Sequence, residues 1–429
     1  MNKFMGVDIN GWHDWSARDW DPDEDEQAFK EYHLIDGGVG SVAIRRSPGN
    51  WLGGPRAVIA PHGRGKGWGD IGNPDYRCNI SETIQNLITR DIPDDGLAFA
   101  STVKELSKGS NRIIVTVPDN ADIREKTQGQ ILKALNHRGA PRAQILWRSI
   151  AFFLGALKKD LISDLRQGLI VTVILHDTNG FEKQTLKVSS TSSHPDHLIP
   201  ERKTFGQIIH PDVGLKNLND DLWSNIQSNN DLLNSGRIET SRLPIEFLCG
   251  DHHHPASEIL RHNNAQWLLA EAHEPNLDVS TVESLVLDEC DLVLFASPVD
   301  GKLRKKILAT LAHLTTPLIE IPWSTGAIGA LYAARLIEKG LPHYLETLEP
   351  ISLAVLRNGI ASFSPLIGND QTVPAHKEFS ADIVDEFIWP ANINEIEFYI
   401  KKGEAEVRKW IISTDEAPDQ NARIDINLR

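Results

Sequence analysis

The sequence has little of several residue types that would point to particular protein classes. Only 3 of its 429 residues are cysteine. Cys78, Cys249 and Cys290 lie far apart and form no Cys-x-x-Cys pair, which argues against a disulfide framework and against a cysteine zinc site. No apolar run reaches the roughly 18–20 residues that a membrane-spanning helix needs. The apolar stretch at the start is too short for a signal peptide and soon meets Asp8. We therefore expect a cytoplasmic protein with no membrane partner.

Basic residues are also few relative to acidic ones. The chain has 44 Lys and Arg against 59 Asp and Glu, a formal net charge of −15. Proteins that bind nucleic acid normally present a basic surface to the phosphates, so no nucleic-acid partner is expected. Hydrophobic residues make up 40% and charged residues 24%, as in ordinary soluble globular proteins. The length is enough for two to three domains.

Apolar strands alternate with helices over about the first 350 residues. The patterns predict strands at 4–9, 111–118, 168–177, 291–296 and 317–322, and helices at 81–88, 121–136, 144–157, 301–314 and 325–339. Residues 189–245 are polar and predict one or two exposed helices. From Pro350 the apolar period changes to two, which is typical of strands. This order predicts an α/β protein followed by an all-β tail.

An apolar strand runs into an Asp-x-Asn-Gly sequence twice, at Asp8–Gly11 and at Asp177–Gly180. Asn-Gly favours a tight hairpin because both residues tolerate positive φ. The two matches are either a coincidence or the mark of a duplicated α/β domain whose halves face each other across a cleft. In the second case, backbone N–H groups of the two turns would bind a phosphate chain. Asp8 and Asp177 would face the magnesium ion that accompanies it.

Several segments resemble, in the same order, the DnaK-type heat-shock chaperones of the actin-like ATPase superfamily. The resemblance covers most of the chain, more weakly at 15–110 and 189–280. The matching segments are Met5–Ile9 (the first phosphate-loop strand), Ile113–Pro118 (a strand of the first half), Ile145–Leu157 (the linking helix), Leu175–Glu182 (the second phosphate hairpin), Leu292–Pro298 (the adenosine-site strand and loop), Gly326–Glu338 (a small-residue helix) and Glu349–Leu353 (the start of the β-sandwich).

The resemblance implies a duplicated actin-like, ribonuclease H-like ATPase fold, with halves at 1–167 and 168–349 and a short β-sandwich-like module at 350–429. It implies ATP or ADP and Mg²⁺ between the halves, with a protein partner or client reached through the switching of an interaction surface. Asp8, Asp177 and Glu182 are the expected catalytic residues, and the first two also face the metal ion. The expected nucleotide-binding residues are Asn10, Gly11, Asn179, Gly180, Ala296 and Ser297.

The sequence also departs from the family pattern at its nucleotide contacts. Bulky residues, Trp12 and His13, follow Asn10-Gly11 where the family has Gly-Thr-Thr, and the second hairpin is shorter. Trp147-Arg148 stands where the family has Glu-Pro, and Arg77 is the nearest candidate for its phosphate-binding lysine. These changes predict slow turnover. They leave open a pseudo-ATPase scaffold that acts only through protein contacts, by the acidic loop 19–26 or the edges of the β module.

Two further clusters were weighed against plain loops. His252–His254 cannot all face one metal ion from regular structure, because neighbouring side chains diverge. A loop could bring two of them together with Asp251 or Glu258, which would make a metal-dependent hydrolase a third reading. A polar loop before a helix is the simpler interpretation. The segment Gly63–Gly67 is basic and glycine-rich but lacks the Walker A frame, so we interpret it as a surface loop.

Overall fold

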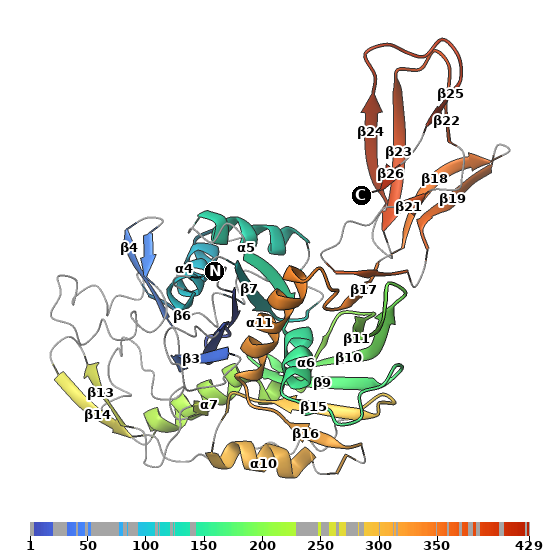
Figure 1. Cartoon of the computed structure of the whole chain (residues 1–429). Coiled ribbons are helices and arrows are strands. Elements are labelled where there is room, and N and C mark those ends of the chain that lie inside the picture. Colours follow the sequence, from blue (N-terminus) through green and yellow to red (C-terminus); the bar gives the residue numbers. More distant parts are fainter. Residues whose placement is uncertain are drawn as a thin grey trace. The chain divides into compact units, whose positions relative to one another are not determined.

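The computed structural model divides the chain into two compact units, shown in Figure 1. The first comprises Met1–Val188 and Phe205–Leu341, and the second comprises Ser189–Thr204 and Pro342–Arg429. The structure describes residues 4–19, 32–39, 42–47, 50–52, 77–79, 84, 93–107, 110, 112–120, 123, 125–137, 143–228, 248–249, 257–262, 266–271, 282, 287–299, 301–311, 313–314, 316–348, 350–357, 360–368, 371–375, 381–382, 387–402, 407–424 and 427–428.

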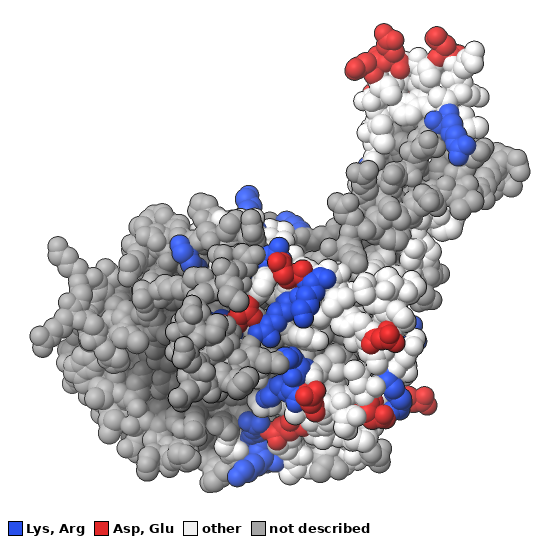
Figure 2. All heavy atoms as spheres, viewed as in Figure 1, with Lys and Arg blue, Asp and Glu red and all other residues white. Residues whose placement is uncertain are grey.

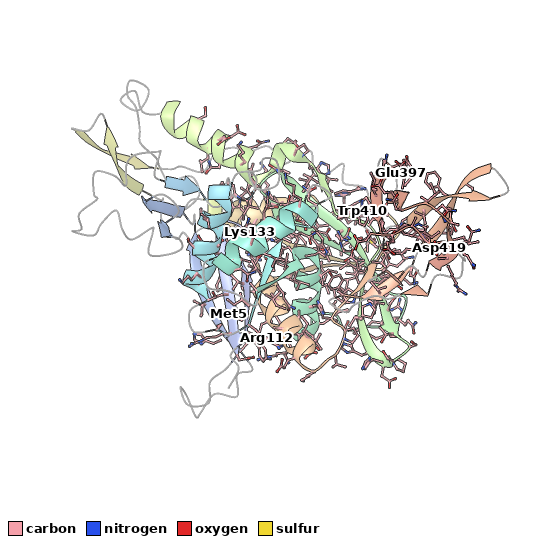
Figure 3. All side chains as sticks on the ribbon, turned by 90° about the horizontal axis from the view of Figure 1, so that it is seen from above. Met5, Arg112, Lys133, Glu397, Trp410 and Asp419 are labelled. Carbon is pink, nitrogen blue, oxygen red and sulfur yellow. The ribbon has the colours of Figure 1, made fainter. Side chains whose placement is uncertain are left out.

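The first sheet has the strand order β3-β2-β1-β7-β8. Its strands are β1 (Phe4–Asp8), β2 (His13–Asp19), β3 (Tyr32–Val39), β7 (Arg112–Val117) and β8 (Ala143–Trp147). The pairs β1–β2 and β2–β3 are antiparallel, whereas β1, β7 and β8 run parallel. Met5 and Arg112, labelled in Figure 3, mark β1 and β7 at the start of their pairing. β1 and β7 are almost wholly buried, as expected for short apolar strands covered on both faces.

The second sheet starts in the first unit with the order β16-β15-β9-β10. β9 and β10 are antiparallel, and β9, β15 and β16 are parallel. β10 continues into the second unit, where the order goes on with β11, β17 and β20, so that β11-β10-β9-β15-β16 repeats the order of the first sheet. The bounds are β9 (Ile170–Asp177), β10 (Gly180–Thr191), β11 (His194–Arg202), β15 (Leu292–Ala296), β16 (Leu318–Glu320), β17 (Leu345–Thr347), β20 (Thr372–Pro374) and β12 (Gln207–Ile209), which pairs with β10.

Two helices, α6 (Arg148–Lys158) and α11 (Thr325–Glu338), pack tightly against each other through glycines and lie side by side in Figure 1. A Cβ atom added to Gly329 would lie 1.7 Å from the carbonyl oxygen of Ala151, and one added to Gly155 would lie 2.1 Å from that of Thr325. α11 packs on β1 in the same way at Gly6. The glycine-rich composition of 325–339 therefore permits contact between backbones.

The first unit has further helices among its described residues. They are α4 (Pro93–Leu106), α5 (Glu125–His137), α7 (Leu215–Ser228), α10 (Gly301–Leu311) and the 3₁₀ turn η3 (Pro211–Val213). Small sheets are formed by β4 (Val42–Ser47), β5 (Asn50–Leu52) and β6 (Arg77–Asn79), and by β13 (Ser257–His262) and β14 (Gln266–Glu271). Within the described ranges, no helix has the length and hydropathy needed to cross a membrane.

The second unit consists mainly of strands. Its largest separate sheet has the order β19-β18-β23-β24, from β18 (Ile351–Arg357), β19 (Ile360–Ile367), β23 (Glu395–Lys402) and β24 (Arg408–Ser413). Two short pairs complete it: β21 (Ala381–Asp382) with β26 (Asn427–Leu428), and β22 (Phe387–Trp389) with β25 (Ala422–Ile424). The described residues after 350 form strands and no helix, as the change of period near residue 350 predicts for them.

The predicted elements of the first unit are mostly found, with four corrections. The segment after His254-Pro255 was expected to begin a helix, but Ser257–His262 forms the strand β13. Residues 144–157 are not one helix: the segment begins as β8 and becomes helical only at Arg148. The polar region 189–245 holds the end of β10 and all of β11 in addition to α7. α5 begins at Glu125 rather than at residue 121. The predicted helix at 81–88 (apart from Ile84), the loop Gly63–Gly67, most of the acidic loop 19–26 and His252–His254 lie outside the described residues.

Charges of both signs are interspersed over the described part of the face shown in Figure 2. Ion pairs join distant parts of the first unit. The Arg335 guanidinium lies 2.7 Å from the Asp19 carboxylate, and Arg112 pairs with Glu338. Such exposed pairs contribute little to stability, typically below about 1 kcal/mol each.

Candidate functional site

Five polar residues of the first unit stand at or just after the carboxyl ends of parallel strands. β1 ends at Asp8, β9 ends at Asp177, and Asp119, Arg148 and Ser297 follow β7, β8 and β15. All five are buried. Ligands of open α/β sheets bind outside the carboxyl ends of the strands, so this group is the candidate site.

The Arg148 side chain links the two halves of this group. Its Nε donates to Asp8 Oδ1 at 3.1 Å, and its Nη2 donates to the Ile9 carbonyl oxygen at 3.2 Å. Its Nη1 forms an ion pair with Asp177 Oδ2 at 3.4 Å. The side chain is 0% exposed. Asp8 and Asp177, which the repeated sequence pattern suggested as partners, are therefore brought together, and the group between them is a guanidinium.

Asp8 has a second set of neighbours. Its Oδ1 also accepts a hydrogen bond from the Thr116 hydroxyl of β7. Its Oδ2 is buried and has no hydrogen-bond partner among the described residues. A Cβ atom added to Gly326, in the first turn of α11, would lie 3.1 Å from this Oδ2. The positive end of the α11 dipole thus faces the carboxylate, which favours its negative charge.

Burial and charge act in opposite directions on the ion pair. Burial raises the pKa of Asp8, and the charge of Arg148 and the hydrogen bonds from Thr116 and Arg148 offset this only in part. Burial alone would lower the pKa of the Arg148 guanidinium, but Asp8, Asp177 and Glu182 together raise it. Arg148 is therefore a permanent positive charge inside the protein, as arginine is in general.

Glu182, on β10, is the third predicted acid and lies near the pair without bonding to it. It is 0% exposed, and no side chain among the described residues donates a hydrogen bond to its carboxylate. Burial raises its pKa to about 8, an effect that the Arg148 charge opposes and the charges of Asp177 and Asp119 reinforce. At neutral pH most of this carboxyl group is protonated.

Asp119 fixes one wall of the site. Its Oδ2 accepts from the Ser149 hydroxyl at 2.7 Å, and its Oδ1 accepts from the backbone N–H of Gly206 at 3.1 Å. Gly206 is required at this point because an added Cβ would lie 2.2 Å from the Asp119 carbonyl oxygen. Asp119 was not among the residues predicted from the sequence, although an acid directly after a strand and a proline is a usable signal.

The first hairpin forms hydrogen bonds within itself and with the second hairpin. Asp14 Oδ1 accepts from the backbone N–H groups of Asn10 and Gly11, both at 2.9 Å. These N–H groups, predicted to bind phosphate, are thus already satisfied by a carboxylate. Trp12, which is 3% exposed, donates from its indole Nε1 to the Thr178 hydroxyl at 2.9 Å. Trp12 therefore joins the two predicted phosphate loops.

The second hairpin is covered by the segment that follows β12. The Thr178 carbonyl oxygen accepts from the backbone N–H of Lys216 at 3.1 Å. A Cβ added to Gly214 would lie 2.7 Å from the nitrogen of Gly180, which itself has a φ of 133°. Asn179 is exposed, whereas Gly180 is buried. A type I′ turn, the usual Asn-Gly hairpin turn, needs positive φ at both residues. In the two Asn-Gly pairs only the glycines, Gly11 and Gly180, have it.

The predicted adenosine loop, Ala296-Ser297, is buried and internally bonded. The Ser297 hydroxyl lies 3.0 Å from His176 Nδ1 and accepts from the backbone N–H of Val299. His176 Nε2 lies 2.7 Å from the Val213 carbonyl oxygen, so Nε2 carries the proton and Nδ1 accepts from Ser297. Burial lowers the pKa of His176 to about 4, so the ring is neutral. This histidine at the end of β9 was also missed by the sequence analysis.

The residues as arranged do not fit a magnesium ion. Mg²⁺ requires near-octahedral oxygen ligands at about 2.0–2.1 Å and usually keeps several waters. The space between Asp8 and Asp177 is instead taken by the Arg148 guanidinium, and both carboxylates are buried. In the part of the chain that the structure describes, no group of three or more His, Cys, Asp or Glu side chains has metal-binding geometry.

The comparisons with known proteins give structural neighbours only. No protein-family model matches the sequence, and no curated protein matches it. Among solved structures, the chain is similar to MreB 5 of Spiroplasma citri bound to AMPPNP, with 9% identity over 79% of this chain and 98% of that chain and a TM-score of 0.42. It is also similar to a non-polymerising mutant of MamK bound to AMPPNP, with 14% identity over 78% of this chain and 99% of that chain and a TM-score of 0.35. Neither comparison ties the chain to DnaK-type chaperones.

Proposed function

We propose that the chain is a nucleotide-binding protein of the actin-like architecture that hydrolyses ATP very slowly or not at all. The observation that carries the proposal is the pairing of Asp8 and Asp177, each at the end of the first strand of its sheet, through one buried cation. A chaperone activity is not part of the proposal, because no observation of the described residues supports it.

In the proposed architecture, one α/β domain occurs twice in the chain. Both sheets have three strands in hairpin order followed by two parallel strands, β3-β2-β1-β7-β8 and β11-β10-β9-β15-β16. Each first strand ends in an aspartate and leads into a hairpin containing Asn-Gly. Two independent α/β sheets would rarely share strand order and hairpin sequence, so duplication is the simpler explanation. It would place a cleft between the two sets of strand ends.

Positive groups near the strand ends support phosphate binding at this place. The first residue of α6, Arg148, donates to Asp8 through its side chain, and the first turn of α11 lies next to the Asp8 carboxylate at Gly326. Helix N-termini favour anions, and a guanidinium is a strong donor to phosphate oxygens. For a nucleotide to use them, the Trp12–Thr178 hydrogen bond between the two hairpins would have to open.

The same geometry argues against efficient hydrolysis. Phosphoryl transfer in such folds depends on a metal ion and a positioned water. The aspartates that would face a metal ion already bind Arg148. Glu182 has a pKa of about 8, so at neutral pH it is mainly protonated and is a poor general base.

The test is calorimetric titration of ADP and ATP into wild-type protein and the Asp177→Asn variant, together with a phosphate-release assay. We expect nucleotide binding that weakens in Asp177→Asn, because Arg148 loses part of its fixed position, and phosphate release no faster than in buffer. Asp164→Asn is the control, since Asp164 pairs with Arg166 at an exposed site. Absence of binding up to millimolar nucleotide would refute the proposal.

A protein-interaction scaffold is the second candidate, and β24 favours it. β24 is at the end of its strand order, and Trp410, Ile411 and Ile412 on it are 59%, 57% and 46% exposed. Figure 3 labels Trp410 together with Glu397 of the neighbouring β23. Exposed apolar edge strands readily pair with a strand of another chain. Sedimentation velocity on wild type and Ile411→Lys tests this, since loss of an associated species in the variant would support it.

A further inference from the structure

We propose that Arg148 is a built-in cation that takes the place of a divalent metal ion between Asp8 and Asp177, so that the wild-type cluster excludes divalent cations. The inference concerns the cluster itself. Only its corollary, that nucleotide binding draws on no metal ion at this pair, rests on the proposed function.

The geometry shows that the guanidinium has the place and the contacts of a bridging cation. It meets an oxygen of each aspartate, at 3.1 Å from Asp8 Oδ1 and 3.4 Å from Asp177 Oδ2, and a third oxygen at 3.2 Å in the carbonyl of Ile9. The guanidinium is planar and rigid, so these contacts define its position. A metal ion at about 2.0–2.1 Å from the same carboxylate oxygens would overlap it.

The charges lead to the same conclusion. Asp8 and Asp177 are buried anions, which proteins keep only when a cation or metal ion compensates them. Arg148 supplies one positive charge at all accessible pH values. Thr116 and the N-terminus of α11 stabilise Asp8 further. A divalent ion would enter a space that already holds a fixed positive charge, so its attraction to the carboxylates would be offset by repulsion from the guanidinium.

The position of Arg148 is unfavourable for two reasons, the helix dipole and complete burial, which indicates a specific role. It is the first residue of α6, where the helix dipole disfavours a cation. It is the only charged residue at 145–157 and is fully buried. Arginine is almost never fully buried unless it is paired. A residue in a locally unfavourable position is typical of a functional site. Here the two aspartates compensate the buried charge of the arginine.

The experiment counts Mn²⁺ ions bound per chain by electron paramagnetic resonance, with full-length protein and Mn²⁺ alone as the probe. Wild type and Asp177→Asn should bind the same number of ions, which means that no ion lies at the aspartate pair. Arg148→Gln should bind one additional ion per chain, and Arg148→Gln/Asp177→Asn should lose it. Arg166→Gln, at an exposed ion pair, is the matched control and should behave like wild type.

Two outcomes would overturn the proposal. One is an ion bound to wild type that disappears in Asp177→Asn. The other is a folded Arg148→Gln protein that gains no ion. If Arg148→Gln fails to fold, Arg148→Lys replaces it: the lysine keeps the charge, so this variant should bind no additional ion, and an additional ion would contradict the role of charge. Failure of nucleotide binding in the calorimetric test refutes the proposed function and leaves all of these metal measurements unaffected.

Discussion

The buried carboxyl group of Glu182 gives a sharp prediction about pH. Its pKa rises from 4.5 in the unfolded chain to about 8 in the folded protein, mainly through burial. Between these two pH values the folded state holds a proton that the unfolded state has released. The contribution of protonated Glu182 to the free energy of unfolding is therefore fully present below pH 4.5 and is lost as the pH rises toward 8. The loss approaches about 1.4 kcal/mol per pH unit and amounts to several kcal/mol in total.

The perturbation is Glu182→Gln, which keeps the size of the side chain and cannot ionise. The variant and wild type should have similar unfolding free energies near pH 5, and the variant should be more stable by a few kcal/mol at pH 9. Urea unfolding followed by tryptophan fluorescence between pH 5 and 9 measures this difference. The difference between the proteins is the relevant quantity, because His176 contributes a slope of the opposite sign below pH 6.5.

Glu416→Gln is the control, since this side chain is exposed in the second unit. It should leave the pH dependence of unfolding as it is in wild type. Parallel curves for wild type and Glu182→Gln from pH 5 to 9 would refute the reasoning, because they would show that Glu182 does not change its ionisation on unfolding in this range.

Four other predictions concern packing and protonation. Gly329→Ala should prevent folding of the first unit or destabilise it by more than about 3 kcal/mol, because its Cβ would lie 1.7 Å from a backbone oxygen. In contrast, Gly129→Ala in α5 meets no atom within 4 Å and should stabilise by about 0.5–1 kcal/mol; thermal unfolding measures both. Trp12→Phe should lower stability by about 1–2 kcal/mol in urea titration, through the lost bond to Thr178, and an unchanged midpoint would contradict that contact. Wild type should lose stability as the pH falls from 6.5 to 4, because His176 is neutral in the folded protein, with a pKa of about 4, and takes up a proton on unfolding. His176→Gln should lose less stability over this range. An equal loss in the variant and in wild type would contradict the prediction.

The strands that carry the site could be predicted from the sequence because their signals are local. β1, β7 and β9 are short apolar runs that end at an acid or directly before a proline. α11 ends at Glu338, two residues before Gly340, which has a φ of 70°. The pairing of Asp8 with Asp177 followed from the repeated Asp-x-Asn-Gly sequence. Such patterns depend on neighbours in sequence, so one sequence is enough to find them.

The central residue of the site could not be placed in this way. Residues 144–157 are apolar almost throughout, and a buried strand cannot be distinguished from a buried helix by the period of such a run. No glycine or proline marks the change from β8 to α6 at Arg148. A single arginine inside this run was a signal that a buried acid must face it. Which acids those are depends on contacts 140 residues apart, as between Arg148 and Asp8.

The most direct test of the account is calorimetric titration of ADP into wild-type protein, once with Mg²⁺ and once with EDTA. The account predicts binding of closely similar affinity in the two buffers, because Arg148 provides the cation at Asp8 and Asp177. Binding that appears only with Mg²⁺, and that is lost in Asp177→Asn, would contradict it, as would the absence of binding in both buffers.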